Sequence, residues 1–230
     1  MSKQVVILAA GMGTRLARPL PKPLTELRDG RSIMQQQFDN LKTAFGSDFR
    51  ATIVVGYKLE AIMERFPEAS FVYNEVYDQT NTSKSLLRAL KASSDGGVLW
   101  LNGDVVFHPG VLTRVAELIE AEQSFVVVNT SKVSDEEVKY TLDSEGFIAE
   151  LSKSVVGGLG EAVGINFVGA ADKAALIEKL EAVADGDYFE RGIELGIESA
   201  GLRFRAVDIS DLYAVEVDFD EDLARANELF

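Results

Sequence analysis

A glycine-rich turn follows the first apolar run of the chain, and its residues could bind phosphate groups. The run from Val5 to Ala9 leads into Ala10-Gly11-Met12-Gly13-Thr14-Arg15 and then into Pro21-Lys22-Pro23-Leu24. Residues 1–25 contain Lys and Arg but no Asp or Glu, although the formal net charge of the chain is −14. Glycine lets backbone N–H groups approach phosphate oxygens, and Arg15 and Lys22 can neutralise charge that develops during phosphoryl or nucleotidyl transfer. This local reversal of charge points to a bound polyphosphate.

Two other phosphate-binding loops do not fit these residues. The P-loop requires Gly-Lys followed by Ser or Thr, and the stretch that begins at Gly11 lacks it. The dinucleotide-binding fingerprint requires a third glycine, where this chain has Leu16. The turn therefore belongs to another class of phosphate site.

Two aspartates stand directly after apolar runs that have the composition of strands. Asp104 follows Leu101-Asn102-Gly103, and Asp218 follows Val215-Glu216-Val217. Ligands of parallel sheets bind beyond the carboxyl ends of the strands, so both side chains should lie where a substrate binds. Mg²⁺ takes one or two carboxylates and fills its other positions with water and phosphate oxygens, which predicts a magnesium site at this pair. The simpler alternative for each is an aspartate that caps a helix or forms a turn.

Short β-branched runs alternate with amphipathic segments of helix length along most of the chain. Because the strand-like runs are apolar throughout, they predict an α/β fold with a doubly wound, mixed but mostly parallel sheet between helices. Strands are expected at 5–9, 51–55, 71–73, 97–101, 125–128, 163–168, 203–207 and 213–217. Helices are expected at 32–45, 59–65, 82–92, 109–122, 173–183, 189–198 and from 220 onward.

This alternation is interrupted between residues 130 and 162. The stretch from Val138 to Ser152 has the pattern of short strands joined by the turn signal Asp143-Ser144-Glu145-Gly146, and Val156 to Gly160 has the composition of a loop. We therefore expect a single domain over residues 1–230, in which 130–162 form a small β-rich insertion over the sheet.

Composition excludes several classes of function. The chain has no Cys, so disulfides, zinc thiolate sites and thiol nucleophiles are excluded. No apolar run of about 18 residues and no signal-peptide pattern occur, which predicts a cytoplasmic protein without membrane insertion. Its 37 Asp and Glu against 23 Lys and Arg argue against nucleic acid, which needs a broad basic face. The oligomeric state, a homodimer included, is left open.

The motifs together resemble the small nucleotidyltransferases of the NDP-sugar pyrophosphorylase superfamily. The pattern that carries this resemblance is Leu8-Ala9-Ala10-Gly11-x-Gly13-x-Arg15, Lys22 between prolines, Asn102-Gly103-Asp104 and Glu216-x-Asp218. It is most similar to the bacterial phosphocholine, inositol-phosphate and phosphonate cytidylyltransferases. The resemblance spans most of the chain, with the N-terminal motif strongest and the middle weakest.

The resemblance implies a Rossmann-like fold and specific roles for several residues. CTP would bind across the glycine-rich loop, with Lys22 and Arg15 as catalytic cations and Mg²⁺ held by Asp104 and Asp218. Further matches are Asn81-Thr82-Ser83-Lys84-Ser85, like the segment beside the nucleotide, and Gly160-Glu161-Ala162-Val163-Gly164, like the segment before the acceptor region. The nucleotide-binding residues implied in this way are Leu8, Ala10, Gly11, Gly13, Asn81, Ser85 and Asp104, and Glu161 is implied for the acceptor.

The stretch Asp185-Gly186-Asp187-Tyr188-Phe189-Glu190 is the candidate for acceptor recognition. Aromatic rings and carboxylates together can hold an ammonium group, so Tyr188 and Glu190 are predicted to bind an amine-bearing acceptor. The alternative is an ordinary helix start with Asp187 as the cap and Phe189 in the core. Lys139 and Lys153, in the insertion, are candidates to reach acceptor or nucleotide phosphates, whereas Glu136-Glu137 is expected to be a solvated face.

The predicted function is a Mg²⁺-dependent transfer of a nucleotidyl group, with CTP preferred, to a small phosphorylated or phosphonate alcohol or amino alcohol such as phosphocholine. One alternative is a sugar-1-phosphate uridylyl- or guanylyltransferase. Another is a non-catalytic nucleotide-sensing module, which would not need the metal and phosphate residues together.

Overall fold

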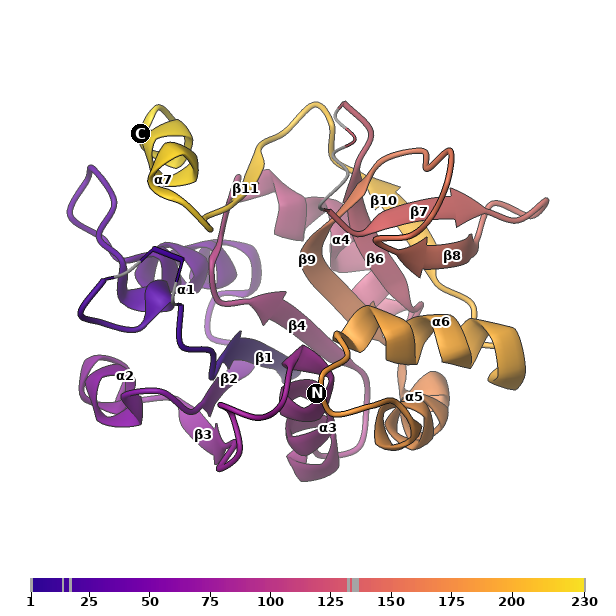
Figure 1. Ribbon diagram of the computed structural model, residues 1–230, viewed down its shortest axis with the longest axis horizontal. Helices are drawn as coiled ribbons and strands as arrows, with labels where there is room; N and C mark the ends of the chain where they lie inside the picture. The colour runs from indigo at the N-terminus through magenta and orange to yellow at the C-terminus, as the bar shows by residue number, and fades with distance from the viewer. Residues whose placement is uncertain (1, 14, 17, 132, 134–136, 230) are drawn as a thin grey trace.

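A mixed β-sheet with helices on both faces organises the protein (Figure 1). The computed structural model describes residues 2–13, 15–16, 18–131, 133 and 137–229. The main sheet has the strand order β10-β6-β9-β4-β1-β2-β3. These strands are β1 (Lys3–Ala9), β2 (Phe49–Val55), β3 (Ser70–Tyr73), β4 (Val98–Asn102), β6 (Phe125–Asn129), β9 (Glu161–Val168) and β10 (Arg205–Asp208). Neighbouring strands are parallel except that β9 is antiparallel to both β4 and β6, which confirms the predicted mixed, mostly parallel sheet.

The helices cover the sheet in two layers, which explains why its strands are apolar on both faces. One layer contains α1 (Ile33–Phe45), α2 (Leu59–Arg65) and α4 (Gly110–Glu120), and the other contains α3 (Thr82–Ala92), α5 (Ala170–Ala182) and α6 (Phe189–Ala200). Side chains alternate between the faces of a strand. In β1, Val5 and Ile7 accordingly pack with the first layer, and Val6 and Leu8 pack with the second.

Two short elements next to the site were not predicted from the sequence. A 3₁₀ turn, η1 (Lys22–Leu24), follows the glycine-rich loop, and β5 (Val105–Phe107) follows β4 after a tight turn. The last strand, β11 (Ala214–Glu216), pairs antiparallel with β5 in a separate two-stranded sheet. Asp218 therefore follows a strand as expected, but this strand pairs antiparallel with β5 and lies outside the main sheet.

The predicted insertion contains a hairpin that extends the main sheet. It consists of β7 (Lys139–Leu142) and β8 (Ile148–Ser152), and β7 also pairs with the first residue of β9. The predicted turn is present, because Oδ1 of Asp143 accepts hydrogen bonds from the N–H groups of Glu145 at 2.8 Å and Phe147 at 2.9 Å. The predicted end of the insertion at residue 162 falls inside β9, because this strand begins at Glu161. Glu136 lies outside the described residues.

The C-terminal helix α7 (Asp220–Asn227) packs beside the glycine-rich loop. A small cluster of buried apolar side chains joins them, with Leu16 from the loop, Val217 after β11 and Ala226 from α7. This cluster brings two ends of the chain together at one site. None of the helices in the described part of the chain is long and apolar enough to cross a membrane.

Candidate functional site

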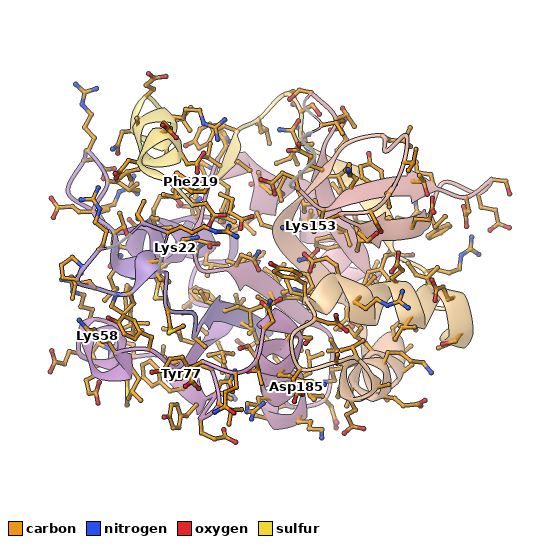
Figure 2. The ribbon with its side chains drawn as sticks, viewed as in Figure 1. Lys22, Lys58, Tyr77, Lys153, Asp185 and Phe219 are labelled. Carbon is orange, nitrogen blue, oxygen red and sulfur yellow. The ribbon has the colours of Figure 1, made fainter. Side chains whose placement is uncertain are left out.

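A cavity of about 1100 Å³ opens at the carboxyl ends of β1 and β4. Figure 2 shows Lys22 and Phe219 on one side and Lys153 across from them. The sequence-predicted residues that line the cavity are Leu8, Gly11, Gly13, Arg15, Lys22, Asn81, Asp104, Lys153, Glu161, Tyr188, Glu190 and Asp218. Ala10 and Ser85 line an adjoining cavity of about 80 Å³. The structure thus brings together residues that are up to 210 positions apart in the sequence, from Leu8 to Asp218.

The glycine-rich loop packs directly against Lys22. Gly13 has a φ of +59°, in the region that favours glycine, and a Cβ at this position would lie 3.0 Å from the Cβ of Lys22. Pro21 and Pro23 then fix the backbone on both sides of Lys22 at the start of η1. Thr14 of the predicted motif lies outside the described residues. Gly13 and Lys22 are therefore in direct contact.

Lys22 lies between the two predicted aspartates. Its Nζ is 2.7 Å from Oδ2 of Asp104 and also forms an ion pair with Oδ1 of Asp218. The second carboxylate oxygen of Asp218 is 2.7 Å from the guanidinium of Arg15. The side chains of Arg15, Lys22, Asp104 and Asp218, which come from separate sequence motifs, thus form one continuous charge cluster.

Pairing between β5 and β11 places these aspartates next to one another. Gly103 turns the chain after β4 so tightly that a Cβ there would lie 2.7 Å from the carbonyl oxygen of Leu8. Asp104 follows this turn, and its carbonyl oxygen accepts a hydrogen bond from the N–H of Val217 at 3.0 Å. Asp218 is the next residue, and Asp222 in α7 accepts hydrogen bonds from the N–H groups of Asp218 and Phe219. The backbone therefore fixes both carboxylates.

The cluster shifts the acid–base equilibria of its members. Burial disfavours the ammonium of Lys22, but the charges and hydrogen bonds of Asp104 and Asp218 outweigh burial and hold the pKa of Lys22 above its usual range. Burial alone would raise the pKa of Asp218, yet Lys22 and Arg15 hold that pKa below its usual value. Both groups are thus charged near neutral pH.

A third carboxylate, Glu216, belongs to the same cluster and was not predicted as a metal ligand. One carboxylate oxygen from each of Asp104, Glu216 and Asp218 lies within 4.8 Å of the others. The sequence carried a signal, because residues i and i+2 of a strand share a face, as in Glu216-x-Asp218. Burial and the charge of Asp104 raise the pKa of Glu216 well above its usual value, and Glu137 adds to this shift. Glu137 is half-buried and lines the cavity.

The carboxylate set fits a divalent cation that prefers oxygen ligands. Oδ1 of Asp104 is buried and has no hydrogen-bond partner among the described residues. Mg²⁺ binds one or two protein carboxylates in octahedral geometry and keeps water or phosphate at its other positions. Asp104, Glu216 and Asp218 together offer such ligands at the wall of an open cavity.

The start of α3 forms another wall of the cavity. The side-chain oxygen of Asn81 accepts a hydrogen bond from the N–H of Thr82 at 2.8 Å and caps this helix. The hydroxyl of Ser85 accepts a hydrogen bond from the amide of buried Asn74 at 3.0 Å. Tyr77 lines both cavities between these residues. The smaller cavity is thus a recess beside the glycine-rich loop, lined by both polar and apolar side chains.

The start of α6 and the end of β8 form the wall across from Lys22, and the start of α6 adjoins the start of α3. The Tyr188 ring is 41% exposed, and Nζ of Lys153 lies 5.0 Å from its centroid. Glu190 is 8% exposed, and its Oε2 has no hydrogen-bond partner among the described residues. Burial raises the pKa of Glu190 to about 7, against the opposing effect of the Lys153 charge. An aromatic face, a buried carboxyl and a cation therefore meet here.

The structure places Lys139 outside the cavity, and Asp187 is not the helix cap that the alternative reading of residues 185–190 predicted. Lys139 is buried in β7, packs against Gly158 in the loop after β8 and is not among the residues that line the cavity. Asp187 does not cap α6; its carboxylate instead accepts a hydrogen bond from the N–H of Ala184 at 2.9 Å. Phe189 is buried in the core, as the alternative predicted.

Comparisons with known proteins agree with this geometry. The sequence matches the MobA-like NTP transferase domain family over residues 5–189. It is 29% identical over 97% of its length to a CMP-5'-(3-aminopropyl)phosphonate synthase from Streptomyces rubellomurinus. It is 30% identical over 56% of its length to the bifunctional protein GlmU of Acaryochloris marina. The chain spans 38% and 29% of the lengths of these relatives.

Solved structures with the same fold include two cytidylyl-transferring proteins. The inositol-1-phosphate CTP transferase from T. maritima has a TM-score of 0.79 at 16% identity, with 99% of this chain and 94% of that chain covered. The CTP:phosphocholine cytidylyltransferase from Streptococcus pneumoniae has a TM-score of 0.75 at 19% identity, with 100% and 99% covered. At these identities the likeness shows the fold alone. The family match over residues 5–189, on this fold and around this charge cluster, shows that the chain belongs to the MobA-like NTP transferase domain family.

Proposed function

We propose that this protein transfers a cytidylyl group from CTP to a small phosphorylated or phosphonate amino alcohol, such as phosphocholine or an aminoalkyl phosphonate, in a Mg²⁺-dependent reaction. The observation that carries the proposal is the meeting of Lys22, Asp104 and Asp218 at the wall of one large cavity. The name of the Streptomyces relative, a synthase of a CMP-linked aminopropyl phosphonate, supports an acceptor that carries an amine.

The reaction needs alignment and charge neutralisation more than proton transfer. An oxygen of the acceptor phosphate or phosphonate is already an anionic nucleophile, so a general base is not required. This oxygen forms a bond to the α-phosphorus of CTP, the bond from that phosphorus to the bridging oxygen of the β-phosphate breaks, and diphosphate leaves with the electron pair. The site must therefore align two anions and stabilise the charge on the leaving group.

The charge cluster supplies these functions in the proposal. Asp104, Glu216 and Asp218 would hold Mg²⁺, which, when bound, reduces the repulsion between acceptor oxygens and the α-phosphate. Lys22 and Arg15 contact the nucleotide phosphates, and the raised pKa of Lys22 keeps its ammonium charged. Backbone N–H groups at Gly11 and Gly13 approach the phosphates without a Cβ in the way.

The recess between the glycine-rich loop and the start of α3 is the proposed base site. It is small, and it offers the amide of Asn81, backbone groups near Leu8 to Gly11 and the network through Ser85. A few polar groups of this kind can read the amino and carbonyl edge of cytosine. We therefore expect CTP to be preferred over the purine nucleotides.

Tyr188, Glu190 and Lys153 form the proposed acceptor site. The Tyr188 face and the Glu190 carboxyl would hold an ammonium group, and Lys153 would hold the acceptor's phosphate or phosphonate. Glu161 lines the same wall. On this assignment residues 130–162 of a single 1–230 domain form the acceptor-side lobe.

Diphosphate release measured over a panel of four NTPs and about a dozen phosphorylated acceptors tests the proposal. The expected result is the highest kcat/KM for CTP with an amine-bearing phosphate or phosphonate. Equal or better rates with GTP or ATP would refute the base assignment. If inositol 1-phosphate or a hexose 1-phosphate is the best acceptor, the amine assignment fails while cytidylyl transfer stands. A protein that binds NTPs but releases no diphosphate with any pair is a sensor.

Two substitutions separate the acceptor site from the nucleotide site. Tyr188→Ala and Glu190→Gln should each raise KM for the acceptor and leave KM for CTP nearly unchanged. Tyr73→Ala, an exposed aromatic at the far edge of the sheet, is the control. An equal rise in both Michaelis constants would show that the residues hold the cavity together and do not recognise the acceptor.

A further inference from the structure

Lys84 is a buried lysine whose side chain does not line the cavity, although its neighbours in the sequence do. It lies in the first turn of α3, between Asn81 and Ser85, and is only 7% exposed. A buried ammonium is costly unless its hydrogen bonds are satisfied. Its partners therefore explain why it is buried here.

The ammonium of Lys84 holds the end of a different helix. Nζ donates hydrogen bonds to three backbone carbonyl oxygens, those of Leu180 at 3.0 Å, Val183 at 2.7 Å and Glu181 at 3.4 Å. These carbonyls end α5, where helix carbonyls lack partners of their own and the helix dipole favours a cation. The carboxylate of Asp185 also lies near Nζ, at a distance of 3.8 Å.

The segment that follows α5 is fastened to the same turn of α3. The N–H of Asn81 donates to the carbonyl oxygen of Asp185 at 2.8 Å, and the N–H of Ser83 donates to that of Asp187 at 3.4 Å. In return, the N–H of Phe189 donates to the hydroxyl of Thr82 at 3.1 Å. N–H groups at the start of α3 thus find acceptors in the segment before α6, and the first N–H of α6 finds an acceptor in α3.

These contacts join two walls of the cavity. Asn81 and Thr82 line it from the start of α3, and Tyr188 and Glu190 line it from the start of α6. Helix α3 is also held by its packing on β1 and β2, whereas residues 183–188 have no helix or strand of their own. Helix α6 packs on α3, α5 and β8. What holds residues 183–188 therefore decides how Tyr188, and the first turn of α6 that carries Glu190, meet the start of α3.

We propose that Lys84 is a positioning residue that fixes the acceptor side of the cavity against the nucleotide side by holding the end of α5 and the segment 183–188. Loss of its three donors frees this segment, and Tyr188 and Glu190 then sample positions away from the nucleotide. This inference rests on the proposed function for its kinetic consequence, but its structural consequence can be measured without any reaction.

The chain contains a matched control at the other end of the same helix pair. Lys173 lies near the start of α5, and its Nζ donates to Ser93 Oγ at 3.2 Å and to the carbonyl oxygens of Ser94 at 2.5 Å and Gly96 at 2.8 Å. The two lysines therefore make similar contacts at opposite ends of the α3–α5 pair, whose helices lie side by side in Figure 1. Only the contacts of Lys84 adjoin the cavity.

The test compares Lys84→Met with Lys173→Met in the full chain. Both should lower the temperature of thermal unfolding, because each leaves carbonyl groups without their donor. Amide hydrogen exchange of residues 184–189 should speed up at least about ten-fold in Lys84→Met and stay unchanged in Lys173→Met. KM for the acceptor should rise at least about five-fold in Lys84→Met alone, with KM for CTP within about two-fold.

Lys84→Arg, which keeps a cation and several donors, should restore part of both effects. If Lys84→Met does not fold, Lys84→Gln, which keeps one amide donor, takes its place in the comparison. Equal exchange rates and equal KM values in the Lys84 and Lys173 variants would overturn the proposal and leave Lys84 as a stabilising contact only. If the wild-type protein transfers no nucleotidyl group to any acceptor, while Lys84→Met still speeds up amide exchange of residues 184–189, the proposed function is refuted and the positioning role of Lys84 stands.

Discussion

The charged residues of the site acquire their properties from one another. Lys22 stays protonated because two aspartates surround it, and Asp218 stays ionised because Lys22 and Arg15 flank it. Glu216, a few ångströms away, has the opposite tendency because it is more deeply buried and faces other acids. At the residue scale, position within the cluster decides which groups are charged.

Asp104→Ala and Asp218→Ala should each lower kcat at least about 100-fold while the protein stays folded, because each removes a proposed metal ligand from the transition state. Steady-state diphosphate release and circular dichroism check the two parts of this expectation. Asp220→Ala is the control, since this exposed aspartate pairs only with Arg18 among the described residues. Activity near that of the wild type in Asp218→Ala would contradict a site built on both aspartates.

Lys22→Ala should lower kcat more than it raises KM for CTP, because its ammonium meets charge that develops as the phosphate is transferred. The comparison variant is Arg18→Ala, which removes a cation from the same loop but at the surface. Initial rates over a range of CTP concentrations separate the two constants. A rise in KM alone would show that Lys22 only docks the nucleotide.

Glu190→Gln should change the pH dependence of stability. Burial raises the pKa of Glu190 to about 7 from its usual value of 4.5, so the folded protein binds the proton of Glu190 more tightly than the unfolded chain does. This contribution to stability is complete below pH 4.5 and is lost as the pH rises through about 7. The loss between these limits amounts to about 3 kcal/mol.

Urea unfolding at pH 4.5 and pH 8 measures this effect as the difference between wild type and Glu190→Gln. The variant should gain stability relative to the wild type as the pH rises, by up to about 3 kcal/mol. Glu178→Gln, an exposed carboxylate on α5, is the control for changes elsewhere. A difference that is the same at both pH values would show that Glu190 titrates alike in the folded and unfolded states.

Among the elements, short ones decide the geometry of the site. The turn between β4 and β5 aims Asp104 at Lys22, and the pairing of β5 with β11 brings Asp218 beside it. Both rely on a close approach of the backbone at Gly103, next to the end of β1. The long helices, by contrast, cover the sheet and set only where its edges lie.

Gly103→Ala should displace this turn, because the added Cβ would lie 2.7 Å from the Leu8 carbonyl and 2.9 Å from Pro23 Cγ. We expect a loss of about 1–3 kcal/mol in the free energy of unfolding together with a fall in kcat, since Asp104 moves with the turn. Gly186→Ala is the matched control, because a Cβ there meets open space. Full activity in Gly103→Ala would show that the turn can shift without moving the carboxylate.

At the scale of the whole molecule, the cations of the N-terminal region are neutralised by acids from elsewhere. Lys3 pairs with Asp48 and Glu120, Arg18 pairs with Asp220, and Lys22 and Arg15 pair with the site aspartates. The basic segment seen in the sequence is therefore not a basic patch on the folded surface. An anionic nucleotide approaches a molecule whose formal net charge is −14.

The association rate constant of CTP should consequently rise as the ionic strength increases from about 10 mM to about 150 mM, because salt screens long-range repulsion between the two anions. Stopped-flow mixing with a fluorescent CTP analogue, at constant Mg²⁺, measures this rate. A rate that falls steeply with salt would instead show that a positive field extends from the mouth of the cavity.

The sequence by itself determined the layered α/β fold and the charged residues Arg15, Lys22, Asp104 and Asp218 of the cavity wall. Strands that are buried on both faces can be recognised in the sequence as apolar runs. A local signal of spacing or composition likewise marks the glycine-rich turn, Lys22, Asp104 and Asp218. Helices α2 and α3 begin and end where the pattern predicts them. Such features depend on neighbours within a few residues, which is why periodicity and motifs reveal them.

Only the tertiary structure decided how these residues meet. Pairing of β11 with β5 placed Glu216 in the carboxylate set, and Lys139 is buried in β7 while Lys153 lies over the Tyr188 ring. The ion pairs of Lys22 and Arg15 likewise join residues about 80 to 200 positions apart in the chain. Contacts between residues so far apart depend on strand pairing and packing over the whole chain, and no local pattern encodes them.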